Sequence, residues 1–229
     1  MAAGEARRMR PVSERWPKPI LPIDGRPVIA TLLRELAAAG IGRVTVVCGH
    51  LGAQIERLLG DGAAFGIAVS YATQARPLGS ADAVVRARAS GACPPFLIVG
   101  ADTLFRPGDV GRFARGFTGA RADGALAIRR QPPPGEGRSA VGVEAGRVRT
   151  VLDHEPGNPV SAAPLWGFTG QLDPFLEDLR GPPLELAEAY QRAIDEGLEV
   201  AALEIGATRD LTFPVDLVKE NFPYLSAES

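Results

Sequence analysis

The 229-residue chain carries 25 Lys and Arg against 27 Asp and Glu, and 45% of its residues are hydrophobic. The near-neutral balance argues against a nucleic-acid or anionic-membrane partner, which usually requires a basic excess, and the length suffices for the core of one large domain. Cys48 and Cys93 lie in apolar runs and predict buried free thiols in a reducing compartment, and the lack of an 18-residue apolar run or signal peptide predicts a cytoplasmic location.

Strand-like and helix-like segments alternate in the first half of the chain. The apolar spacing predicts helices at 27–39, 51–59 and 80–89, and strands at 43–49, 67–74 and 95–100. This alternation predicts parallel βαβ units in an α/β fold, with a Rossmann-like, mostly parallel sheet flanked by helices.

The second half shows a different, mixed pattern. The predicted elements are a helix at 109–117, a strand at 125–130, a loop at 131–138, a hairpin at 140–152, a strand at 164–168, helices at 174–179 and 184–196, a strand at 200–205 and a helix at 213–225. We interpret this half as a mixed α+β lid region inserted on the core, within a single domain over residues 1–229.

The first two dozen residues combine small side chains with cations. Ala2, Ala3 and Gly4 let the backbone approach a ligand closely, and Gly4 tolerates a positive φ. Exposed backbone N–H groups together with the cations of Arg7, Arg8, Arg10 and Lys18 are what a polyphosphate requires. The chain has only two lysines, so Lys18 suggests a task for a compact ammonium that a guanidinium cannot fill. The alternatives are a mobile basic tail and a lysine retained by chance.

Two further stretches carry polar groups at strand ends. Asp102 follows an apolar strand, where open α/β sheets gather their ligands, although a strand-end Asp on its own is more often a turn or cap. The amide of Gln74 can meet both N3–H and a carbonyl of uracil or thymine. Gly79 lets the backbone reach a base edge, and Ser80 can cap the helix that starts there. A polar strand end before a capped helix explains Gly79 and Ser80 but not Gln74.

The opening stretch, AAGEARRMRP…WPKPILPIDGRPVI, resembles the nucleotide-binding start of the sugar-1-phosphate nucleotidyltransferases, roughly AAGxGTRLxP followed by KPxLPI. Ala6 stands at the family's second glycine and Arg7 at its Thr or Ser. In this resemblance, Arg8 matches the phosphate-binding arginine and Lys18 the catalytic lysine.

Three more stretches resemble motifs of the same family. FLIVGADTLF resembles its G-D-(N/T)-(L/I)-F motif, with Ala101 as a departure, and this implies that Asp102 binds magnesium. RDLTFPVDLVKEN resembles its closing motif and implies Asp210 as the second metal ligand, whereas Asp216 is read as serving a helix dipole. QARPLGSADA resembles its Q-x-x-x-x-G-(T/S)-A-x-A motif and implies a pyrimidine nucleotide.

The sugar side matches the family less well. Gly142, in AVGV, corresponds to the family's contact to the hexose, and Gly167, in LWG, to its segment before G-(I/V)-(Y/F). His154 and Glu155 lie in the slot of its E-K-P motif, whose lysine is absent; His154 or a nearby arginine is the candidate replacement, with a solvated loop histidine as the alternative. Trp166 either faces a sugar ring or fills the core.

The resemblance implies an enzyme that joins a pyrimidine nucleoside triphosphate, dTTP or UTP, to a sugar 1-phosphate, releases pyrophosphate and uses Mg²⁺. The implied catalytic residues are Arg8, Lys18 and Asp102. The alternatives are a CTP-dependent transferase for polyol or choline phosphates, a molybdopterin-type guanylyltransferase and a degenerate nucleotide-binding regulatory domain. The expected partners are small molecules, with a homo-oligomer possible.

A sheet of this kind normally begins with a central strand directly before the nucleotide loop. The loop begins at residue 1 here, which leaves no room for that strand. We expect that several apolar residues precede Met1 in the complete protein; the alternative is that the sheet lacks this strand.

Overall fold

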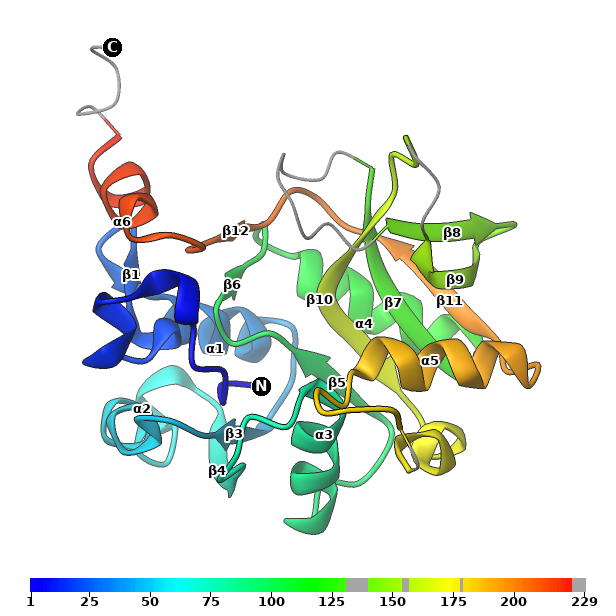
Figure 1. Ribbon diagram of the computed structural model, residues 1–229, viewed down its shortest axis with the longest axis horizontal. Coiled ribbons are helices and arrows are strands. Elements are labelled where there is room, and N and C mark those ends of the chain that lie inside the picture. Colours follow the sequence, from blue (N-terminus) through cyan, green and yellow to red (C-terminus); the bar gives the residue numbers. More distant parts are fainter. Residues whose placement is uncertain (131–139, 154–156, 178, 224–229) are drawn as a thin grey trace. The chain divides into compact units, whose positions relative to one another are not determined.

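The computed structural model of the chain (Figure 1) describes residues 1–130, 140–153, 157–177 and 179–223. The chain divides into two compact units. The first comprises Met1–Pro77, Gly100–Leu104 and Arg209–Ser229, and the second comprises Leu78–Val99 and Phe105–Thr208. The single domain expected over 1–229 stays a prediction.

The first unit is built from short strands and three α-helices. The helices are α1 (Val28–Ala38), α2 (Gly52–Leu59) and α6 (Pro214–Asn221). β3 (Arg43–Cys48) and β4 (Ala68–Thr73) pair in parallel across α2, as the alternating pattern predicts. Two antiparallel ribbons complete the pairing in this unit: β1 (Pro22–Ile23) with β2 (Arg26–Pro27), and β6 (Thr103–Leu104) with β12 (Arg209–Asp210).

The chain start runs alongside β3. The N–H of Ala2 donates to the carbonyl of Val47 over 2.9 Å, and the carbonyl of Met1 accepts from the N–H of Ala101 over 3.0 Å. Met1 and Ala2 therefore pair on one side with β3 and on the other with the residue that precedes Asp102.

The second unit is a six-stranded mixed sheet with helices. Its strand order is β5-β10-β7-β11-β9-β8, and β7 and β11 form its parallel pair. The strands are β5 (Phe96–Val99), β7 (Gly124–Arg129), β8 (Ala140–Glu144), β9 (Arg147–Asp153), β10 (Ser161–Phe168) and β11 (Val200–Glu204). The α-helices are α3 (Ser80–Ala89), α4 (Asp109–Ala120) and α5 (Leu186–Asp195).

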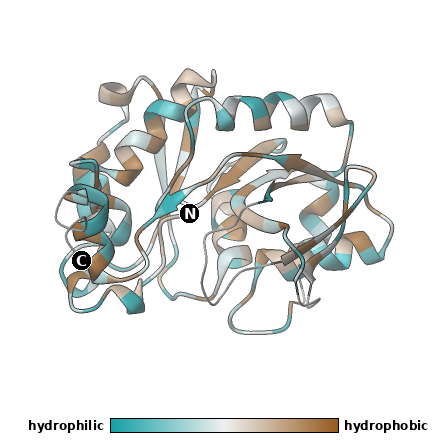
Figure 2. Ribbon diagram, turned by 90° about the horizontal axis from the view of Figure 1, so that it is seen from above, coloured by the Kyte–Doolittle hydropathy of each residue, from teal (hydrophilic) through white to brown (hydrophobic). Residues whose placement is uncertain are grey.

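Hydrophobic and hydrophilic segments alternate along the helices, as the brown and teal of Figure 2 show, which is the pattern of helices that bury one side. In the second unit, Phe113 of α4, Leu126 of β7, Phe168 of β10 and Tyr190 of α5 are all essentially inaccessible. The buried hydroxyl of Tyr190 donates to the carbonyl of Gly167 over 2.7 Å, which satisfies the one polar atom of that side chain.

The α/β class is confirmed, and the mixed character expected of the second half is found there. The helix predicted at 174–179 is wrong: a 3-10 helix spans Gly170–Leu176 with Pro174 inside it. Both cysteines are free, but Cys93 is exposed rather than buried. Burial raises the pKa of the Cys48 thiol to about 11, which keeps this group neutral.

Candidate active site

Lys18 lies against two carboxylates that come from distant parts of the sequence. Its Nζ is 2.7 Å from Oδ2 of Asp102 and 3.7 Å from Oδ2 of Asp210. The lysine side chain is 14% exposed, and the two carboxylates are 36% and 47% exposed. The three charges therefore form a half-buried cluster that a small ligand can reach.

The local backbone explains why these three side chains meet. Lys18 opens a 3-10 turn, Lys18–Ile20, and Pro17 and Pro19 restrict φ on both sides of it. Asp102 directly precedes β6, and Asp210 is the second residue of β12, where its Cα faces Thr103. The β6–β12 ribbon thus brings the carboxylates of residues 102 and 210 to the same end.

The segments that carry this cluster share a small apolar core. Its buried members are Met9, Leu21, Ile23, Val28 and Leu211, with Ala6, Val12, Leu104 and Leu217 packed against it. The members come from the N-terminal loop, the segment after Lys18, α1 and the residue after Asp210. The burial of apolar surface therefore joins the segments that carry the charged residues.

The donor set of Asp102 and Asp210 fits a hard divalent cation. Oδ2 of Asp102 and Oδ2 of Asp210 both lie within 3.7 Å of Nζ of Lys18. The distance between these two oxygens therefore cannot exceed the sum of their distances to Nζ. Mg²⁺ typically takes one or two carboxylates and completes its shell with water and substrate phosphates. Within the described ranges, no group of three or more His, Cys, Asp or Glu side chains could hold a metal ion by itself.

The N-terminal loop makes its bend at Ala6 rather than at Gly4. Ala6 has φ 49° and ψ 48°, while Gly4 is exposed and is not among the positive-φ glycines. A left-handed residue other than glycine costs about 1–2 kcal/mol. Ala6 therefore adopts the conformation for which the family pattern has glycine.

Small residues hold the start of this loop close to β3. Ala2 and Ala3 are buried, and a Cβ on Gly49 would lie 2.6 Å from the carbonyl oxygen of Ala3. Arg8 lies in the 3-10 turn Arg7–Met9 with an exposed side chain. The loop is thus anchored through its alanines while Arg8 faces solvent.

Gln74 follows β4 in the first unit. Its side chain is buried, and its N–H donates to the carbonyl of Cys48 at the end of β3 over 2.8 Å. The residue therefore ends the β3–β4 pairing, and its contact with a base stays a prediction.

Gly79 and Ser80, in the second unit, contact the segment before α5. Gly79 has φ +116°, and a Cβ there would lie 2.3 Å from the carbonyl oxygen of Leu184. The Ser80 hydroxyl donates to Glu185 over 2.6 Å and accepts from the N–H of Leu186 over 2.7 Å. Ser80 thus satisfies the first N–H of α5 instead of capping its own helix, which is a correction to the expected cap.

Both predicted sugar-site glycines, Gly142 and Gly167, have a packing role in the second unit. A Cβ on Gly142 would lie 2.2 Å from Oγ1 of Thr150, and one on Gly167 would lie 2.7 Å from the ring of Phe117. Trp166 is 8% exposed and packs edge-on against Tyr190, so it belongs to the core. The proposed contacts of Gly142 and Gly167 with a sugar stay predictions.

His154 and Glu155 lie outside the described residues. Asp216 accepts the N–H groups of Thr212 and Phe213, both over 2.8 Å, so it caps α6 and supports the structural reading of this residue.

The sequence reading missed Asp24 and Arg209, which pair beside the cluster. The Asp24-Gly25 dipeptide is a strong hairpin-turn signal and would have located the β1–β2 turn. No local pattern indicates that Arg209 reaches that turn.

Comparison with known proteins gives a consistent result. A family model described as nucleotidyl transferase matches residues 1–138. A glucose-1-phosphate thymidylyltransferase of Streptomyces griseus is 31% identical over 96% of this chain. The chain covers 64% of the length of that relative.

Solved structures show the same fold. A UDP-glucose pyrophosphorylase from Acinetobacter baumanii matches with a TM-score of 0.78 and 20% identity, over 100% of this chain and 93% of that one. An inositol-1-phosphate CTP transferase from T. maritima matches with a TM-score of 0.79 and 19% identity, over 94% of this chain and 88% of that one. None of the helices in the described ranges is long and apolar enough to cross a membrane.

Proposed function

Because this chain belongs to the nucleotidyl transferase family, we propose that it joins a nucleoside triphosphate to a sugar 1-phosphate and releases pyrophosphate. A pyrimidine nucleotide, dTTP or UTP, is the favoured donor, in keeping with the name of the Streptomyces griseus relative. The observation that carries the proposal is the position of Lys18 between the carboxylates of Asp102 and Asp210.

The proposed reaction is a displacement at the α-phosphorus. A phosphate oxygen of the sugar 1-phosphate forms the new P–O bond, and the bond from the α-phosphorus to the bridging oxygen breaks with its electron pair leaving on pyrophosphate. The nucleophile is already an anion, so no general base is required. Catalysis then depends on aligning two anions and neutralising charge that develops on the phosphates.

The residues of the cluster suit these tasks. We assign Lys18 and Arg8 to the phosphates, with the loop at Ala2, Ala3 and Gly4 offering its backbone N–H groups. Asp102 and Asp210 would hold Mg²⁺, which when bound supplies positive charge to the phosphate oxygens.

Nucleotide selection is assigned to Gln74, Gly79 and Ser80, and sugar-phosphate binding to Gly142, His154, Glu155 and Gly167. A cytoplasmic location and a homo-oligomer are also part of the proposal. The residue assignments rest on the sequence motifs.

The experiment is a pyrophosphate-release assay with dTTP, UTP, CTP, ATP and GTP against a panel of sugar 1-phosphates. We expect turnover with dTTP or UTP, and a loss of at least about 100-fold in Asp102→Asn because a charge-stabilising group is removed. Asp173→Asn is the matched control, since this carboxylate pairs with Arg88 in the second unit. Retained turnover in Asp102→Asn would refute the assignment.

The same assay separates the alternatives. Turnover with CTP and a polyol or choline phosphate, but with no sugar 1-phosphate, would replace the proposed substrate class. Nucleotide binding without any release of pyrophosphate would identify a regulatory domain.

A further inference from the structure

Asp210 lies on a strand too short to hold itself in place. β12 consists of Arg209 and Asp210 alone, paired with the equally short β6. Isolated two-stranded ribbons are marginally stable even when they are longer. The Asp210 carboxylate nevertheless has a defined place, 3.7 Å from Nζ of Lys18. Contacts outside the ribbon must therefore fix its position.

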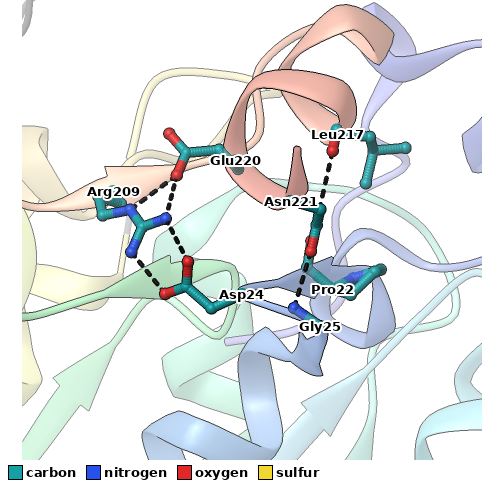
Figure 3. A network of polar contacts seen from close by, with 7 residues as sticks. All are labelled: Pro22, Asp24, Gly25, Arg209, Leu217, Glu220 and Asn221. Atoms are coloured by element: carbon teal, nitrogen blue, oxygen red, sulfur yellow. Dashed lines mark hydrogen bonds and ion pairs between the residues drawn. The ribbon is translucent and has the colours of Figure 1, made fainter. Parts of the chain in front are cut away.

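The residue before Asp210 provides a charged anchor (Figure 3). The Arg209 guanidinium binds Asp24 through two hydrogen bonds, from Nη1 over 2.7 Å and from Nη2 over 2.9 Å. Its Nε donates to Oε2 of Glu220 over 2.7 Å, and its Nη2 also pairs with that oxygen. The neighbouring carboxylates raise the pKa of Arg209, so the guanidinium stays charged.

This anchor differs from an ordinary surface ion pair. Arg209 is 44% exposed, a level at which a single pair contributes little. Here one guanidinium holds two carboxylates and meets Asp24 through a planar, two-bond contact, which restricts its orientation. The contribution is therefore geometric more than energetic.

The partners of Arg209 are themselves fixed. Gly25 donates its N–H to Oδ1 of Asn221 over 2.8 Å, and Nδ2 of Asn221 donates to the carbonyl of Pro22 over 2.9 Å. As Figure 3 shows, these bonds tie the β1–β2 turn to the end of α6. That turn ends the segment that begins at Lys18, so the anchor joins the lysine segment to the aspartate strand.

The strand geometry carries the restraint to Asp210. Successive side chains of a strand point to opposite faces. Arg209 is directed to the turn and α6, so Asp210 is directed away from them, toward Lys18. The next residue along the chain, Leu211, is fully buried in the apolar core with Met9 and Leu21.

We propose that Arg209 is a positioning residue, which through Asp24 and Glu220 holds the Asp210 carboxylate in place to bind a divalent cation beside Asp102. The inference rests on the proposed function for the purpose of that cation. Arg209 thereby joins the residues of the proposed site, although its own side chain contacts neither the cation nor the substrate.

The test measures cation binding apart from turnover. Mn²⁺ alone is titrated into the whole chain, and free Mn²⁺ is followed by electron paramagnetic resonance. We expect Asp210→Asn and Arg209→Gln both to weaken Mn²⁺ binding, the latter by about 10-fold or more, as is typical when a residue that orients a metal ligand is removed. The Mn²⁺ affinity of Arg209→Lys should lie between those of the wild type and Arg209→Gln, because an ammonium keeps the charge but cannot make the two-bond contact with Asp24.

Turnover provides a second readout. In Arg209→Gln we expect kcat to fall by about 10- to 100-fold with KM for the nucleotide little changed, since the cation is misplaced while the nucleotide loop is intact. Asp24→Asn, a milder change, should move both readouts in the same direction by less. The double variant Asp24→Asn/Arg209→Gln should show almost the same losses of Mn²⁺ binding and kcat as Arg209→Gln alone, because both changes break the same contact.

Arg88→Gln is the matched control. Arg88 also holds an aspartate, Asp173, through two bonds, of 2.9 and 2.8 Å, but it lies in the second unit. We expect this variant to leave Mn²⁺ binding unchanged.

The outcomes decide between the inference and the function on which it rests. Unchanged Mn²⁺ binding in Arg209→Gln, an equal loss in Arg88→Gln, or wild-type binding that is absent or insensitive to Asp210→Asn would overturn the inference. Wild-type protein that binds Mn²⁺ through Asp210 and Arg209 but releases no pyrophosphate would support the inference and refute the proposed function.

Discussion

Replacing Lys18 with methionine should change cation affinity and turnover in opposite directions. Methionine keeps the length of the side chain and suits its low exposure, but removes the charge. The ammonium lies 2.7 Å from Oδ2 of Asp102 and 3.7 Å from Oδ2 of Asp210. Without it the two carboxylates lose their internal counter-ion and should bind a divalent cation more tightly, while the phosphates lose a catalytic cation.

The structure sets the size of each effect. Both carboxylates are more than one-third exposed, so the ion pairs are worth about 0.2–1 kcal/mol, equivalent to an affinity about 1.4- to 5-fold tighter for Mn²⁺. Removal of a preorganised group that stabilises transition-state charge typically lowers kcat by about 10²–10³-fold. The loss of turnover should therefore greatly exceed the gain in affinity.

The assay is the same Mn²⁺ titration with pyrophosphate release measured in parallel. Lys219→Met is the matched control, because Lys219 is the other lysine of the chain and is exposed on α6. It should leave both quantities unchanged. Weaker Mn²⁺ binding in Lys18→Met, or turnover at the wild-type level, would refute this account of the cluster.

Two further predictions concern stability. Leu211→Ala should lower the free energy of unfolding in urea by about 2–5 kcal/mol, because a fully buried leucine leaves a cavity; the exposed Leu58→Ala should change it by about 0.5 kcal/mol or less, and equal effects would contradict the packing. Hydrogen bonding from Arg209 lowers the pKa of Asp24 below its ordinary value of 3.8, so the stability that this group adds is present above that pH and is lost as the pH falls through its folded-state pKa. Asp24→Asn should therefore reduce the unfolding free energy by about 0.2–1 kcal/mol near neutrality, with the difference closing in acid; calorimetry that shows a constant difference across the acid range would contradict it.

The sequence predicted the elements that have a clear period. α1, α2, α3 and α5, and strands β3 and β4, lie close to their expected positions, because each carries enough apolar residues to reveal its spacing. The two-residue strands β6 and β12 are too short to show any period. Their pairing joins residues more than a hundred positions apart, which no local pattern encodes.

Tertiary contacts decided the remaining differences. Ser80 stands at a helix start, where local rules favour a cap, yet its hydroxyl binds Glu185 and Leu186. The motifs predicted that Asp102 and Asp210 hold one metal ion close to the loop that carries Lys18, and the structure brings these three side chains together in one cluster. Arg209 was not suggested because its role depends on a turn and a helix end that meet only in the folded chain.

Asp210 lies between two neighbours held by different forces: Arg209 by ion pairs and Leu211 by apolar burial. High ionic strength acts on the first, because the screening length falls to about 3 Å in 1 M salt, which is comparable to the length of the Arg209 contacts. Cold acts on the second, because apolar burial stabilises less as the temperature falls. High salt and low temperature would thus weaken the positioning of Asp210 through different neighbours. Substitutions at residue 209 or 211 would tune this positioning to salt or temperature while Asp210 itself is kept.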